Sequence, residues 1–75
     1  MKEIAPHITA DPDVKLGRPV IRGTRVPVGL VLGQLASGMT IEQVCTAYEL
    51  TREDVLAALA YAAKSVGDEQ VRVVA

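Results

Sequence analysis

The feature that most constrains this fold is a helix-start pattern that occurs twice within a short stretch. Residues 39–44 (MTIEQV) and 50–55 (LTREDV) both read apolar, Thr, any residue, Glu, polar, Val. In each copy the Thr hydroxyl can accept a hydrogen bond from a backbone N–H of the first turn, and the polar residue three positions later can bond back to the Thr N–H. The flanking apolar residues can close a hydrophobic staple. The repeat therefore predicts two helices that begin at these caps.

The spacing of the caps sets the lengths of the helices. One short helix fits at 41–48, and a tight turn then leads to a longer helix from Thr51 to Lys64 or slightly beyond, with Gly67 expected to break it. An earlier stretch, 28–37, carries most of its apolar residues on one helical stripe and is followed by Gly38, which suits a left-handed C-terminal position. We therefore expect three helices, of which the last two form a helix-turn-helix.

The residues before the helices favour a small β element. Ile8 and Thr9 can form a brief strand, and residues 11–13 (DPD) are typical of a turn. The pairs 20–21 (VI) and 26–27 (VP) flank RGTR, which predicts a hairpin whose turn uses the positive φ of Gly23. The expected organisation is a flexible arm at 1–7, a helix-turn-helix domain at 8–66, and a C-terminal tail or docking strand at 67–75.

Charge is divided unevenly along the chain. The formal net charge of −1 lacks the basic footprint of an autonomous nucleic-acid binder. Residues 1–27 nevertheless carry five bases and three acids, whereas residues 28–75 carry three bases and six acids. Any contact with operator DNA is therefore expected mainly from the N-terminal half. The candidate DNA-binding residues are Arg18, Arg22, Arg25 and Arg52, and the alternative for them is ordinary surface charge.

The last predicted helix is nearly uncharged. Residues 55–63 (VLAALAYAA) contain no charged side chain, so we expect this helix to be buried against more than one neighbour. Two acids follow Arg52 and would repel phosphate, which disfavours base reading. Hydrophobic residues make up 49% of this small chain, which favours a homodimer, a higher oligomer or a protein partner over the alternative of one well-filled core. The candidate interface residues are Leu30, Leu56, Leu59 and Tyr61.

The C-terminal segment 70–75 (QVRVVA) alternates weakly, as a β-strand does. It is either a disordered tail or a segment that docks on a partner, and its valines favour docking. The candidate partner-binding residues are Val71, Arg72, Val73 and Val74.

Few side chains in this sequence can carry chemistry. One Cys excludes an internal disulfide, and one Cys with one His gives no zinc-ligand spacing. Cys45 is expected to be a small buried hydrophobe and His7 a surface residue. Without a nucleophile–base pair, a metal cluster or a phosphate-cradling loop, we expect neither an enzyme nor a cofactor. With no signal peptide and no apolar run near eighteen residues, we expect a cytoplasmic protein that does not contact the membrane.

Several stretches between residues 8 and 63 form a distinctive set: 17–28 (GRPVIRGTRVPV), 35–42 (LASGMTIE), 50–55 (LTREDV) and 57–62 (AALAYA). This set resembles the bacterial domain-of-unknown-function family numbered 433. The resemblance implies a homeodomain-like three-helix fold behind a small β element, often as a dimer. It also implies a VapB-like antitoxin, frequently encoded beside a PIN-like ribonuclease toxin.

The sequence thus predicts a mainly α fold, a three-helix homeodomain-like helix-turn-helix bundle with a small N-terminal β-hairpin. The leading functional hypothesis is the antitoxin of a type II toxin–antitoxin system, which binds and neutralises a PIN-like toxin and represses its own operon. The alternatives are a stand-alone DNA-binding transcription regulator and a structural dimerisation module.

Overall fold

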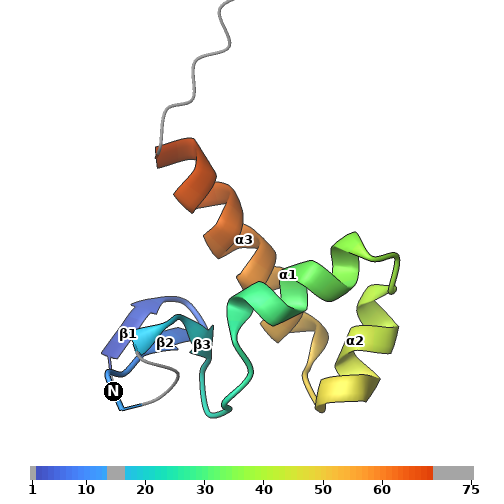
Figure 1. The fold of residues 1–75 in the computed structure, drawn as a ribbon, viewed down its shortest axis with the longest axis horizontal. Coiled ribbons are helices and arrows are strands. Elements are labelled where there is room, and N and C mark those ends of the chain that lie inside the picture. The colour runs from blue at the N-terminus through green and yellow to red at the C-terminus, as the bar shows by residue number, and fades with distance from the viewer. Residues whose placement is uncertain (1, 14–16, 69–75) are drawn as a thin grey trace, which may run out of the picture.

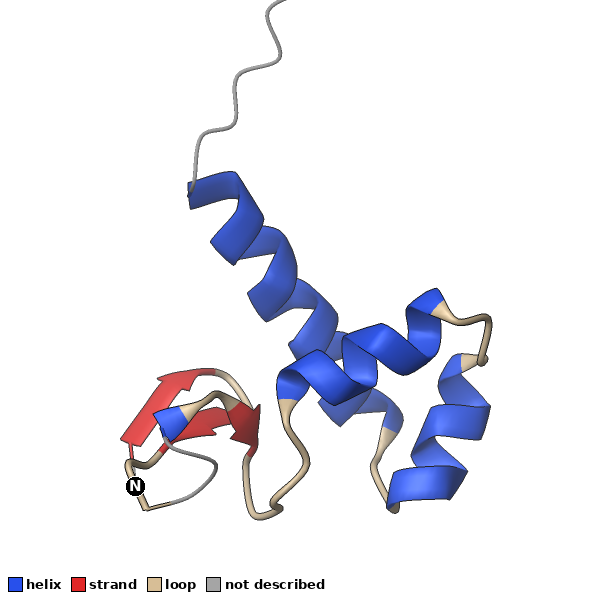
Figure 2. Ribbon diagram, in the orientation of Figure 1, coloured by secondary structure: helices blue, strands red, loops and turns tan. Residues whose placement is uncertain are grey.

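Three helices and a small sheet make up the described part of the chain. The computed structural model describes residues 2–13 and 17–68. Three strands, β1 (Lys2–Ala5), β2 (Ile8–Ala10) and β3 (Val20–Ile21), form an antiparallel sheet in that order. The helices α1 (Val28–Ala36), α2 (Ile41–Tyr48) and α3 (Arg52–Asp68) follow. The fold is therefore mainly α with a small N-terminal sheet, as predicted (Figure 1, Figure 2).

Both predicted helix caps are present. The Gln43 N–H donates to Thr40 Oγ1 at 3.1 Å, and the Thr40 N–H donates to Gln43 Oε1 at 2.8 Å. At the start of α3, the Asp54 N–H donates to Thr51 Oγ1 at 3.1 Å, and the Thr51 N–H donates to Asp54 Oδ2 at 3.1 Å. Each reciprocal pair satisfies two backbone N–H groups that have no partner within the helix. Both helices therefore begin where the sequence predicts.

The turn between α2 and α3 uses a residue in an unfavourable conformation. Glu49 ends α2 in the left-handed region, with φ 56° and ψ 45°. That conformation costs a residue with a Cβ roughly 1–2 kcal/mol. The next N–H, from Leu50, donates to the Cys45 carbonyl at 3.0 Å, and the Leu50 side chain is buried. Burial of Leu50 and the cap at Thr51 therefore hold this short turn in place.

The prediction of a flexible arm at residues 1–7 is wrong for residues 2–7, which belong to a β-hairpin. Strand β1 pairs antiparallel with β2, and residues 6–7 form the turn between them. His7 has φ 65°, and a proline followed by a positive φ is the combination of a type II turn. Histidine is one of the few residues other than glycine that adopt this region with some frequency. The hairpin was not predicted because its turn contains no Asn-Gly or Asp-Gly signal.

The predicted hairpin at residues 20–27 forms only in part. Gly23 has φ 79°, as expected, and the Ile21 N–H donates to the Val26 carbonyl at 2.9 Å. Residues 26–27 do not form a strand, and a single bridge joins Val20 to Pro27. Pro27 has no N–H to donate, so the pairing cannot extend. Strand β3 instead pairs with β2 on its other edge.

The core lies where the sheet meets the three helices. Its fully or nearly fully buried apolar side chains come from every element except β1, and from the turn after α2: Ile8, Ile21, Val28, Val31, Val44, Leu50, Val55 and Ala58. The two staple residues Leu50 and Val55 are buried. Cys45 is half-buried rather than buried, and its thiol is free.

Helix α3 is longer than predicted. It continues through Gly67 and ends at Asp68, so residues 67 and 68 belong to the helix and not to a tail. A glycine costs a helix only about 1 kcal/mol relative to Ala, and the preceding run of good helix formers carries the helix past it. Figure 1 shows the C-terminal half of α3 extending away from α1, α2 and the sheet. This half is therefore available for contacts outside the domain.

Candidate protein-binding surface along helix α3

The exposed side of α3 carries a stripe of apolar side chains, which we call the α3 seam: Leu56, Leu59, Ala63 and Val66. Successive members are three, four and three residues apart, a spacing that places them on one side of a helix. Leu56 is 43% exposed, Leu59 36% and Val66 61%. The prediction that this helix is buried on nearly every side is therefore wrong along the seam.

An apolar groove lies beside the seam, between α1 and the C-terminal half of α3. Its volume is about 610 Å³, and we call it the α1–α3 groove. Leu30, Leu32, Tyr61, Ala62 and Val66 form much of its apolar lining. Arg18, whose side chain is exposed, also lines it. Among the residues that the structure describes, the groove therefore combines an apolar surface with the cation of Arg18.

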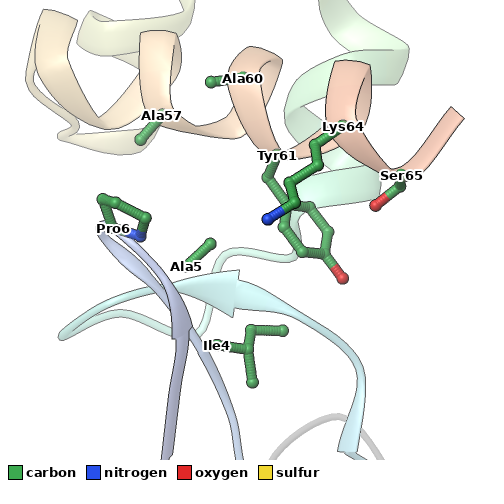
Figure 3. A pocket seen from close by; sticks show the side chains of 8 residues that line it. All are labelled: Ile4, Ala5, Pro6, Ala57, Ala60, Tyr61, Lys64 and Ser65. Carbon is green, nitrogen blue, oxygen red and sulfur yellow. The ribbon is translucent and has the colours of Figure 1, made fainter. Parts of the chain in front are cut away.

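A second hollow lies next to this groove, between α3 and the β1–β2 hairpin. It has a volume of about 520 Å³ and is lined by Ile4, Ala5 and Pro6 from the hairpin and by residues of α3. Figure 3 shows the side chains of Tyr61 and Lys64 on the α3 side of this hollow, with Ala5 and Ile4 on the hairpin side. Tyr61 lines both this hollow and the α1–α3 groove. Tyr61 thus lies between the two hollows and is only half-buried.

The four candidate interface residues do not form one patch. Leu56 and Leu59 lie on the α3 seam, whereas Leu30 and Tyr61 line the α1–α3 groove. Val66, which belongs to both surfaces, was not among the predicted interface residues, because the helix was expected to end between Lys64 and Gly67. The spacing that continues from Leu59 to Ala63 and Val66 was the signal that could have identified it.

The N-terminal end of α3 is linked to the hairpin by His7. Its Nδ1 lies 3.0 Å from Asp54 Oδ1, and the carboxylate can only accept, so the imidazole donates. Burial raises the pKa of Asp54, but the hydrogen bonds from His7 and Thr51 outweigh it and hold that pKa below its usual value. His7 was expected on the surface, and its side chain is 37% exposed, yet it joins two parts of the fold that are 47 residues apart.

The four candidate DNA-binding arginines differ in their surroundings. Arg22 Nη1 donates to Glu3 Oε2 at 2.8 Å, and Arg52 Nη1 lies 3.7 Å from Glu42 Oε1. Arg18 and Arg25 are exposed and have no ion pair within residues 2–13 and 17–68. The structure therefore places acidic side chains beside two of the four arginines, Arg22 and Arg52.

The candidate partner-binding residues Val71, Arg72, Val73 and Val74 lie outside the described residues. Within residues 2–13 and 17–68, no group of His, Cys, Asp or Glu side chains could hold a metal ion. In the same part of the chain, no helix has the length and apolar character needed to cross a bilayer.

Comparison with known proteins places this chain in a family. The sequence model described as "Protein of unknown function (DUF433)" matches residues 8–62. The chain is 41% identical over 56 residues to "Uncharacterized protein y4eO" from Sinorhizobium fredii, a match that covers 73% of this chain. It spans only 25% of the length of that relative.

Two solved structures are similar to this fold. One is a DUF433 member protein from Anabaena variabilis, with a TM-score of 0.75 and 30% identity over 83% of this chain and 62% of the other. The second is Rv2018 from Mycobacterium tuberculosis, with a TM-score of 0.64 and 36% identity over 69% of this chain and 24% of the other. On the family match across residues 8–62, this chain belongs to the DUF433 family of proteins of unknown function.

Proposed function

We propose that this protein is the antitoxin of a toxin–antitoxin pair and acts by binding and neutralising a PIN-like ribonuclease. The observation that carries the proposal is the α1–α3 groove, an apolar hollow of about 610 Å³ whose lining among the described residues includes the cation Arg18. Contiguous exposed apolar surface of this kind is typical of protein–protein contact sites.

The groove suits a helix of the partner. An amphipathic helix binds such a surface by inserting apolar side chains, here against Leu30, Leu32 and Val66, which line the groove. The Arg18 guanidinium can donate two hydrogen bonds to a carboxylate of that helix. PIN-type nucleases gather carboxylates around a divalent cation, so they can offer an acidic surface to the Arg18 side chain at the groove.

The C-terminal residues extend this proposal. The groove is lined as far as Val66, and α3 ends at Asp68, so the chain leaves the domain next to the groove. We propose that residues 69–75 add a strand to the toxin and that Arg72 enters its acidic site, in place of the metal. Removal of residues 69–75 should weaken toxin binding at least tenfold without changing the helical content. Unchanged binding by the shortened chain would exclude the tail from the interface.

Co-purification tests the groove directly. The chain is co-expressed with the untagged product of the adjacent reading frame, and the mass of any complex is recorded by light scattering. Leu30→Lys, at a side chain that is 39% exposed, should abolish the complex while leaving the fold intact. Leu56→Lys is the matched control, because Leu56 is 43% exposed but does not line the groove. Equal complex formation by both variants would contradict the proposal.

The exposed arginines favour a second candidate function, operator binding. Arg18 and Arg25 have no ion pair within the described residues and remain free to contact phosphate. If this chain binds upstream DNA, the double substitution of Arg18 and Arg25 by Ala should weaken DNA binding. It should also lower the slope of log affinity against log salt concentration by about two. The corresponding change of Arg22 and Arg52, which have acidic partners, should have less effect. A mobility shift that is unchanged by the double substitution of Arg18 and Arg25 would show that these two arginines do not bind the DNA.

A further inference from the structure

We propose that the hollow between the β1–β2 hairpin and α3, which we call the hairpin hollow, binds a small amphipathic carboxylate with an apolar tail of about eight carbons. This surface differs from the α1–α3 groove, and the proposal does not depend on the proposed function. Three observations support it: the volume of the hollow, the division of its lining into an apolar and a polar end, and the position of a cation at the polar end.

The lining of the hairpin hollow changes character along α3. Its volume of about 520 Å³ lies within the range of about 300–1,000 Å³ that is usual for small-ligand sites. Figure 3 shows an apolar end at Pro6 and Ala57 and a polar end at Tyr61, Lys64 and Ser65. Ala57 and Lys64 are seven residues apart on one side of α3, which separates them by roughly 10 Å along the helix axis. An extended carboxylate of about eight carbons has a similar length.

Lys64 supplies the positive charge that a carboxylate needs. Figure 3 shows its nitrogen directed from α3 toward the hairpin. Among the side chains that the structure describes, none that lines the hollow is acidic, and none forms an ion pair with Lys64. In the same part of the chain the Tyr61 hydroxyl has no hydrogen-bond partner, so it is available to donate to the same head group. A hydrogen bond from an ammonium to a carboxylate is about twice as strong as one between neutral groups.

The contact between His7 and Asp54 lies beyond the apolar end and sets the orientation of the ligand. His7 directly follows Pro6 in the hairpin turn. Asp54 lies about one helical turn before Ala57, so its 3.0 Å hydrogen bond with His7 fastens the hairpin to α3 at this end. The negative charge of Asp54 disfavours a carboxylate here, whereas Lys64 attracts one at the opposite end. The ligand therefore binds with its tail toward Ala57 and its head group beside Lys64.

Sodium octanoate is the probe that tests this site. It is titrated into the full chain at about pH 7, where it is ionised, and below its micelle concentration. NMR spectra of the backbone amides should show saturable binding of one equivalent, with shifts at Ala57, Ala60 and Lys64. Leu30 and Leu32 line the groove and not the hollow, so their amides should not shift. 1-Octanol, which has the same tail without the charge, should bind at least tenfold more weakly.

Lys64→Met tests the cation, because methionine keeps an apolar side chain and removes the charge. This variant should bind octanoate at least tenfold more weakly than wild type and 1-octanol within about twofold of wild type. Lys64→Arg, which keeps the charge, should bind octanoate within about threefold of wild type. Lys2→Met is the matched control, since Lys2 is an exposed cation of the hairpin that does not line the hollow, and it should leave octanoate binding unchanged.

Ala60→Leu tests the apolar part of the hollow. Ala60 is exposed and lines the hollow, and leucine is also a good helix former, so the larger side chain should block the tail without unfolding α3. Octanoate and 1-octanol should both bind this variant at least tenfold more weakly. Ala63→Leu, at an exposed position of α3 outside the hollow, should weaken neither. Circular dichroism confirms that each variant is folded.

Three results would overturn the proposal: octanoate binding that does not saturate, shifts at the groove amides in place of the hollow, or Lys64→Met binding octanoate as tightly as wild type. Binding that does not saturate would leave the hollow to residues 69–75 of the chain or to another protein.

Discussion

The two halves of α3 use similar residues for opposite purposes. In the N-terminal half, Val55 and Ala58 are fully buried, and Asp54 joins the helix to the cap and to the hairpin. In the remainder of the helix, residues 59–68, Leu59 and Val66 are exposed, and Figure 1 shows this end of α3 extending beyond the other elements. Apolar composition alone does not separate these halves, because both are rich in Ala, Leu and Val. The position of the neighbouring elements decides which half stabilises the domain and which half is free to bind.

The largest contrast should come from truncating one apolar side chain in each half. Val55→Ala removes fully buried groups and leaves a cavity, so it should lower the free energy of unfolding by about 2–3 kcal/mol. Leu59→Ala removes a larger but exposed side chain and should change the free energy of unfolding by less than about 0.5 kcal/mol. Urea titrations of the monomeric protein measure both. A loss at Leu59 as large as that at Val55 would show that the second half is structural.

The next effect concerns Asp54, which anchors only the N-terminal half. Asp54→Ala loses the acceptor for the Thr51 N–H and the bond from His7, and should cost about 1–2 kcal/mol. His7→Gly, which keeps the positive φ of the turn, should cost less, because the cap remains. In a double-mutant cycle the two changes should be less than additive, since they share one hydrogen bond. Strict additivity would show that the His7–Asp54 contact contributes nothing.

Acid should weaken the same anchor. Because the native pKa of Asp54 lies below its usual value, its contribution to stability is complete above about pH 4 and is lost as pH falls through the native pKa. Unfolding measured between about pH 2 and pH 6 should therefore show a smaller acid-dependent loss in Asp54→Ala than in wild type. Identical pH profiles would contradict this role of the carboxylate.

Two smaller effects concern the turns and helices that carry α3. Glu49→Gly should raise stability by about 1 kcal/mol, because glycine adopts the left-handed conformation without strain. Gly33→Ala should add about 0.5–1 kcal/mol, since a Cβ there meets nothing within 4 Å. Gly38→Ala is the control and should destabilise, because Gly38 has φ 109°. Thermal unfolding can rank all three, and a stabilising Gly38→Ala would contradict the backbone argument.

The elements that were predicted correctly are those that depend on local interactions. The caps at Thr40 and Thr51 involve residues three positions apart, so the pattern alone locates the starts of both helices. The β1–β2 hairpin was missed because its turn relies on a histidine with positive φ. Its link to α3 through His7 and Asp54 joins residues 47 positions apart, and no local pattern reports such a contact.

The candidate site was predictable to a similar extent. Leu56 and Leu59 were identified as interface residues from an uncharged stretch, and both are exposed on one stripe. Leu30 lies apart from Leu56 and Leu59 and lines the α1–α3 groove together with Arg18 and Val66. Its position depends on how α1 packs beside α3. Tertiary packing of this kind cannot be read from helical spacing, which places residues on a face but does not say what that face meets.

The mass of the complex formed with the adjacent gene product tests the central claim most directly, namely that the C-terminal half of α3 and its groove bind another protein. Light scattering after co-expression should show a stoichiometric complex for the wild-type chain and no complex for Leu30→Lys. Circular dichroism should show equal helical content for the two chains. A Leu30→Lys chain that still forms the complex, or a wild-type chain that forms none with its genomic neighbour, would contradict the account.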